Sequence, residues 1–175
     1  MTKTSACAAS LAVLTAALAA CASAPPDTPV PSALVPAGER LVGKVAARGV
    51  QIYECRAKKD AAGTEWAFVA PEAELFDAQG RPAGKHYAGP HWEAGDGSKI
   101  VGAVKARADA PQPGAIPWLL LTAKSVGGEG AFAKITSVQR IRTVGGVAPA
   151  DGCDAAALGK SVRVPYTADY VWFAS

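Results

Sequence analysis

The sequence predicts an all-β fold, an antiparallel sandwich or small barrel of about seven to ten strands. Apolar side chains repeat with a period of two through most of the chain after residue 37, as in strands that bury one face. The stretches between these runs are short and rich in glycine and proline, which is typical of turns between antiparallel strands. A helical period is not sustained anywhere after residue 37, so at most one short helix is expected.

The strands can be placed from their side-chain patterns. In 50–55, Val50 and Ile52 share one face, while Tyr53 and Cys55 share the other. Further strands are expected at 66–69, 75–77, 99–107, 118–121, 132–142 and 170–173. The run 118–121 is apolar throughout, which indicates a strand buried on both faces. Pro71 is expected to end the strand at 66–69, because proline cannot donate to a sheet.

The one candidate helix lies at 154–159. Asp154 can cap its first turn and Gly159 can end it, which leaves room for one or two turns.

The first 20 residues have the parts of a secretory signal. Lys3 supplies the positive charge, and 6–20 is an uncharged, Ala/Leu-rich run that is too short to span a bilayer. Residues 18–21 read Leu-Ala-Ala-Cys and resemble a bacterial lipobox, which predicts that Cys21 carries lipid and becomes the N-terminus. The alternative is an ordinary signal-peptidase cut after Ala22 or Ala24.

Lipid on Cys21 would hold the protein to a membrane, because several acyl chains anchor stably. Ala22 rather than Asp follows the cysteine, so in bacteria with two membranes we expect the inner leaflet of the outer membrane, facing the periplasm. Residues 21–37 contain five prolines and are expected to form an extended tether. Residues 38–175 are then long enough for a single domain.

The charge balance argues against nucleic acid as a partner. The full chain has 18 basic and 15 acidic side chains, and loss of Lys3 with the signal leaves a net charge of +2 with no basic cluster. No cofactor motif is present, and nothing in the sequence indicates the oligomeric state.

Cys55 and Cys153 are the two cysteines left in the expected domain. A secreted location permits one disulfide between them, which would stabilise the fold by roughly 4 to 5 kcal/mol in the chain-entropy model. Free thiols or a metal site are the alternatives, although neither cysteine has a Cys or His near it in the sequence.

Several segments together resemble a known family. They are 49–55, 70–73, 84–90, 92–93, 96–98, 115–121, 139–140, 152–153 and 166–170. In this order, from about Val30 to the end, they are similar to the bacterial and fungal domain-of-unknown-function family 3455. The resemblance implies no settled activity. Some fungal relatives are labelled malate dehydrogenases, but the Gly-x-Gly-x-x-Gly motif and βαβ alternation of a dinucleotide-binding fold are missing here. His91 stands where the family more usually has Thr or Ser.

The candidate site is the polar segment 86–96. It contains His86, His91, Trp92, Glu93 and Asp96. An imidazole beside a carboxylate can act as a general base or bind a metal, and Glu93 with Asp96 could form a carboxylate pair as in glycosidases. However, the two histidines are five residues apart, which points them to opposite faces of a strand unless Gly89-Pro90 bends the chain. We therefore predict no metal site. The simpler interpretation is a strand whose polar face is exposed to solvent, followed by an Asp-Gly turn.

Two further features allow both a structural and a binding role. Arg140 is expected to form an ion pair with Asp169 or Glu54, or else to mark a ligand pocket. The aromatic side chains are expected in the core, with a sugar-binding face as the alternative; they are Trp66, Trp92, Trp118, Tyr166 and Trp172.

The sequence thus favours a lipid-anchored envelope protein without enzymatic activity, which binds a small molecule or glycan or supports envelope structure. The alternative is an envelope hydrolase that uses His86, Glu93 and Asp96. The hydrolase requires these three side chains to converge in one pocket.

Overall fold

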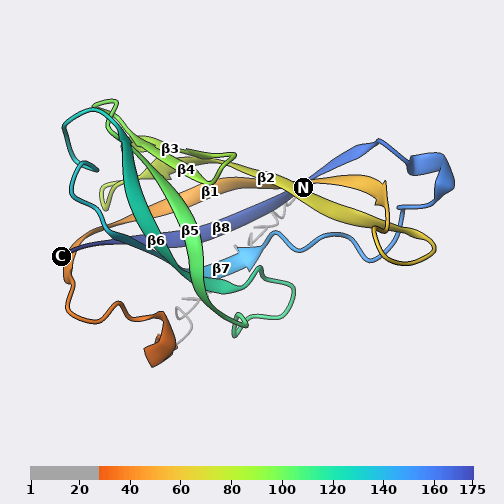
Figure 1. The fold of residues 1–175 in the computed structure, drawn as a ribbon, viewed down its shortest axis with the longest axis horizontal. Coiled ribbons are helices and arrows are strands. Elements are labelled where there is room, and N and C mark those ends of the chain that lie inside the picture. The colour runs from red at the N-terminus through yellow and green to blue at the C-terminus, as the bar shows by residue number, and fades with distance from the viewer. Residues whose placement is uncertain (1–27) are drawn as a thin grey trace, which may run out of the picture.

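The computed structural model describes residues 28–175 and shows one antiparallel sheet that closes on itself (Figure 1). Within these residues, eight strands pair in chain order, and the last pairs with the first. They are β1 (Arg40–Ala57), β2 (Thr64–Phe76), β3 (Pro82–Tyr87), β4 (His91–Ala94), β5 (Lys99–Ala108), β6 (Trp118–Gly127), β7 (Ser137–Gly145) and β8 (Ser161–Ala174). The all-β prediction is confirmed, and the ring is irregular because its strands differ greatly in length.

Three long strands reach beyond the others. β1, β2 and β8 extend together to one side, where they meet the chain between β7 and β8 (Figure 1). A disulfide joins Cys55 to Cys153 there, with a Cα–Cα distance of 5.3 Å, so the predicted bridge is confirmed. The Thr64 hydroxyl also donates to the Cys153 carbonyl at 2.5 Å. This end of the molecule is therefore held by covalent and polar contacts.

Pro71 does not end a strand, which corrects the sequence-based expectation. It lies within β2, opposite Gln51 of β1. The register shifts here, since Ile52 pairs with Ala70 whereas Tyr53 pairs with Phe68. A β-bulge is a place where a sheet accepts proline, because the extra residue relaxes the hydrogen-bond ladder.

The strand expected at 132–142 begins later, at Ser137. Residues before it form turns in which Ala133 N donates to Gly130 O, and Ile135 N to Phe132 O. Phe132 and Ile135 are both buried from this turn, so their apolar pattern reflects core packing rather than strand pairing.

The expected helix is a single 3-10 turn, η2 (Ala155–Ala157). The Asp154 carboxylate accepts from Ala156 N and Ala157 N, which confirms its capping role.

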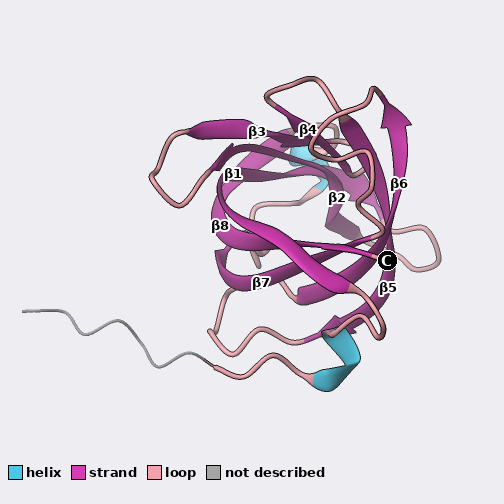
Figure 2. Ribbon diagram, turned by 90° about the vertical axis from the view of Figure 1, so that its left-hand side faces the viewer, coloured by secondary structure: helices cyan, strands magenta, loops and turns pink. Residues whose placement is uncertain are grey.

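Two apolar clusters cover the two faces of β6. Leu121 belongs to the cluster inside the ring, whereas Trp118 and Leu120 pack outside it with Leu34. Leu34 belongs to the 3-10 turn η1 (Ser32–Leu34), which lies against the outside of the ring (Figure 2). This outer layer explains why the run 118–121 is apolar on both faces.

The described segment before β1 contacts the barrel. Val30 and Leu34 pack in the outer cluster, and the Gln139 amide donates to the Leu34 carbonyl at 2.7 Å. The predicted tether is therefore bound to the domain from Val30 onward. The predicted signal at 1–20, Cys21 and the rest of the tether up to residue 27 lie outside the described residues. Residues 28–175 include no helix of the length and hydropathy that a membrane-spanning segment requires.

Candidate functional site

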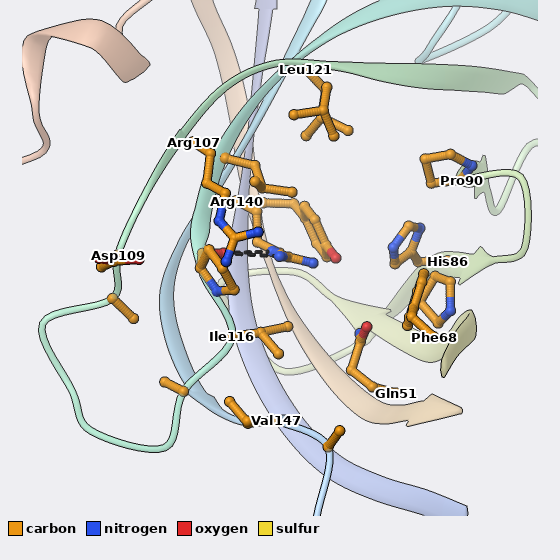
Figure 3. Close-up of a pocket in the computed structure, with 18 of the residues that line it drawn as sticks. Gln51, Phe68, His86, Pro90, Arg107, Asp109, Ile116, Leu121, Arg140 and Val147 are labelled. Atoms are coloured by element: carbon orange, nitrogen blue, oxygen red, sulfur yellow. Dashed lines mark hydrogen bonds between the residues drawn. The ribbon is translucent and has the colours of Figure 1, made fainter. Parts of the chain in front are cut away.

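A pocket of about 930 Å³ opens at one end of the strand ring (Figure 3). Its walls are mainly apolar and aromatic, and its lining comes from every strand together with the β3–β4, β5–β6 and β7–β8 connections. The volume lies within the range of small-molecule sites, and such sites commonly lie in the mouths of β-barrels.

One row of paired residues crosses the pocket wall. Arg107 of β5 pairs with Leu119 of β6, Leu119 with Arg140 of β7, and Arg140 with Tyr170 of β8. Directly paired residues point to the same face of a sheet. The register therefore brings two arginines and a tyrosine to the inner face side by side.

The loop before β6 is fastened to β7 and shapes the pocket mouth. Arg140 donates from Nε and Nη2 to the Pro117 carbonyl at 3.1 and 2.9 Å, and the Thr143 hydroxyl donates to the Ile116 carbonyl at 2.5 Å. Gly146, at φ +85°, allows its backbone to lie close to Ile116 and Tyr166, because a Cβ there would be 3.0 Å from Ile116 and 2.9 Å from Tyr166. The mouth is consequently preformed.

Trp92 forms part of the floor of the pocket. Its ring stacks on His86 with centroids 4.4 Å apart and contacts Tyr170 edge-on at 5.4 Å. Gly102 makes room for it, because a Cβ at that position would lie 2.7 Å from the indole. The prediction that the aromatic side chains lie in the core is confirmed for four of them: Trp92, Trp118, Tyr166 and Trp172. Trp66 is only half-buried, and its indole N–H donates to the Asp151 carbonyl.

His86 presents a neutral, hydrogen-bond-accepting nitrogen to the pocket. It is 3% exposed, and its Nδ1 lies 2.8 Å from the His91 carbonyl. A carbonyl oxygen only accepts, so Nδ1 carries the proton and Nε2 carries the lone pair. Burial lowers the pKa of His86 to about 3, and the charge of Arg140 acts in the same direction.

Gln51 places a buried amide in the same pocket. The side chain is 2% exposed, and Nε2 has no hydrogen-bond partner within residues 28–175. Figure 3 shows Gln51, His86 and Arg140 pointing into a common space from different walls. A buried amide N–H without a partner is costly, so it marks a position where a ligand can supply an acceptor.

Arg140 does not form the ion pair that the sequence suggested. Asp169 pairs instead with Lys44 and Arg142, and Glu54 pairs with Arg56. The reason is alternation along each strand: Tyr170 points inward beside Arg140, so the preceding Asp169 points outward. Within residues 28–175, no carboxylate lies within 4.0 Å of the Arg140 guanidinium.

The five residues proposed from the sequence do not form one site. His86 and Trp92 line the pocket, whereas His91 stacks outside it on Tyr87. Glu93 also faces outward, where it accepts from Tyr87 and pairs with Lys99 at 3.0 Å. The register explains the separation, because Trp92 points inward and both of its neighbours therefore point outward.

Asp96 has a structural role in the turn after β4. Its carboxylate accepts from the Ser98 hydroxyl at 2.6 Å and from the Ala131 amide at 2.8 Å. These bonds, the Ser98 hydroxyl first, hold the pKa of Asp96 down to about 2. The described residues include no group of three His, Cys, Asp or Glu side chains that could hold a metal ion.

The main residues that sequence reasoning missed are Gln51 and Arg107. Gln51 shares a strand face with Tyr53 and Cys55, which are buried. A polar residue on this otherwise buried face was the signal in the sequence that could have indicated a binding site. Arg107 lies in an alternating strand, and its inward position depends on register shifts within the β5–β6 pair.

A family model described as "Protein of unknown function (DUF3455)" matches residues 36–174. Among curated proteins and among solved structures, no match to the chain was found. The matched range contains all eight described strands and every residue that lines the pocket. The resemblance noted in the sequence is thereby confirmed, and the chain belongs to the DUF3455 family of proteins of unknown function.

Proposed function

We propose that this protein is a lipid-anchored binding protein of the cell envelope, which holds a small, partly apolar molecule inside its strand ring. The observation that carries the proposal is the preformed pocket of about 930 Å³, into which the buried Gln51 amide and the Arg140 guanidinium project (Figure 3). Apolar walls with a few convergent polar groups are the usual composition of a ligand site.

The lining supports binding rather than catalysis. Among the described residues that line the pocket there is no Ser, Thr, Cys, Lys or Glu. His86 is a poor general base, because its pKa of about 3 lies far below neutral pH. Glu93 and Asp96, which a hydrolase would need beside His86, are engaged elsewhere.

Binding in the pocket can be tested with the neutral fluorophore N-phenyl-1-naphthylamine, whose emission rises in apolar surroundings. The wild-type chain should show a saturable rise. Val104→Trp should weaken binding by about tenfold or more, because Val104 lines the mouth and a larger side chain there would obstruct it.

Val126→Trp is the matched control. Val126 is 47% exposed on β6 and does not line the pocket, so its substitution should leave binding unchanged. A non-saturable signal, or equal effects of the two tryptophans, would contradict binding inside the ring.

The envelope anchor is supported by the Leu-Ala-Ala-Cys sequence at 18–21. We expect Cys21→Ala to move the protein from the membrane fraction to the soluble fraction, because no residue would then accept lipid. Cys7→Ala, which alters a cysteine inside the predicted signal, should leave the protein in the membrane fraction. Unchanged fractionation of Cys21→Ala would rule out lipid attachment at that residue.

A further inference from the structure

The polar groups of the pocket are mostly hydrogen-bond donors, and two of them are positively charged. Arg107 and Arg140 belong to the same paired row, and Gln51 adds a buried N–H. Among the described lining residues, Asp109 is the one carboxylate; it is exposed at the rim, as is Arg107, whereas Arg140 is half-buried. The interior therefore favours a ligand with negative charge.

Arg140 is held in a defined orientation. The Pro117 carbonyl occupies the guanidinium edge formed by Nε and Nη2. The edge formed by Nη1 and the second Nη2 hydrogen is not taken by the Pro117 carbonyl. The guanidinium also interacts with the Tyr170 side chain, but no described carboxylate pairs with it, and it projects into the pocket (Figure 3). Two parallel N–H groups on one edge match the two oxygens of a carboxylate.

One side of the pocket mouth is apolar. Gln51 and His86 are buried, whereas the rim includes Phe68 and Val104, which are 53% and 60% exposed. A ligand that satisfies both regions carries its charged group inward and leaves an apolar body against the rim. The His86 Nε2 lone pair can in addition accept from a hydroxyl or N–H of the ligand.

We propose that the pocket selects small carboxylates that carry an aromatic or aliphatic body, with the carboxylate bound to Arg140 and Gln51. This inference rests on the proposed binding function and adds the chemical class of the ligand. Arg107, nearer the surface, attracts the anion and is a secondary contact.

The test compares 2-naphthoate with 2-naphthamide, which have the same ring system and differ in charge. At pH 7 the acid is ionised. Titration calorimetry on the wild-type chain should show tighter binding of 2-naphthoate. Arg140→Met should weaken 2-naphthoate by roughly 10- to 100-fold, the range expected when a charge-assisted hydrogen bond is lost. It should change 2-naphthamide binding by less than about threefold.

Two further variants complete the design. Arg140→Lys keeps the charge but lacks the planar fork, so it should restore only part of the 2-naphthoate affinity. Arg163→Met is the control, because Arg163 is an exposed arginine that pairs with Glu72 on the outer surface. It should leave both ligands unaffected.

The outcomes separate the ligand class from the binding function. Equal wild-type affinity for the two ligands, or an equal loss of both in Arg140→Met, would overturn carboxylate selection while the neutral fluorophore still reports the pocket. Failure of the fluorophore and of both naphthalenes to bind would instead overturn the binding function itself.

Discussion

Replacing Cys55 and Cys153 together by alanine is expected to lower the free energy of unfolding by about 4 to 5 kcal/mol. The disulfide joins residues 98 positions apart, so it removes many conformations from the unfolded chain. Such a loss is a large fraction of the total stability of a domain of this size. Urea unfolding monitored by tryptophan fluorescence measures the difference.

The native ring should survive the loss of the bridge, because neighbouring hydrogen bonds remain. Cys55 N donates to Lys160 O, and Gly159 N donates to Cys55 O, both at 2.9 Å. Reduction of the wild type should reproduce the destabilisation, and a reductant should have no further effect on the double variant. A wild type whose unfolding midpoint does not respond to reduction would show that the bridge contributes little.

Acidification from pH 7 to pH 5 is expected to cost the wild type about 2 kcal/mol of folding stability through His86. The pKa of His86 lies near its ordinary 6.5 in the unfolded chain and at about 3 in the folded protein. Because the folded pKa is lowered, the unfolded chain binds the proton first as the pH falls. The stability from His86 is complete above about pH 7 and declines below pH 6.5; the loss approaches roughly 5 kcal/mol below pH 3.

The groups that face His86 explain the direction. Burial is the main cause, and the charges of Arg140 and His91 add to it, while the hydrogen bond to the His91 carbonyl opposes it. The carboxylates with lowered pKa titrate at lower pH, so they contribute little in this window.

Two glutamine variants distinguish the contribution of His86 to the pH dependence of stability from the contributions of other groups. His86→Gln should abolish most of the change in unfolding free energy between pH 7 and pH 5, measured by urea unfolding at each pH. His91→Gln should keep it, because His91 is stacked on Tyr87 at the surface. Identical pH profiles for the two variants would mean that His86 is not the group responsible.

Strand positions could be predicted because alternation and turn chemistry are local. The run 50–55 alternates in the sequence and is part of β1, and Asp154 caps a turn as its position suggested. The disulfide could be predicted because two cysteines remain when the predicted signal and Cys21 are set aside. The predictions for Phe132 and Pro71 were wrong. Phe132 packs in the core from a turn, and Pro71 lies at a bulge opposite Ile52. Both features depend on neighbours far away in the chain.

The candidate site could be predicted only in part. His86 and Trp92 were identified because polar and aromatic residues gather at 86–96, but that density does not show which face each residue occupies. The faces follow from the pairing of β3 with β4, which places Glu93 outside and Trp92 inside. The ion pair expected between Arg140 and Asp169 is absent for a related reason. The sequence places Asp169 next to Tyr170 but does not show which of the two points inward.

By itself, the sequence determined the β class, most strand positions, the single cysteine bridge and the family, because each depends on local pattern or on composition. It also predicts the anchor at Cys21. The tertiary structure alone decided that the sheet closes into a ring, and that Gln51, His86, Arg107 and Arg140 line one pocket. The physical reason is register: a shift of one residue would turn each of these side chains to the other face of its strand, and register is set by pairing between strands distant in the chain.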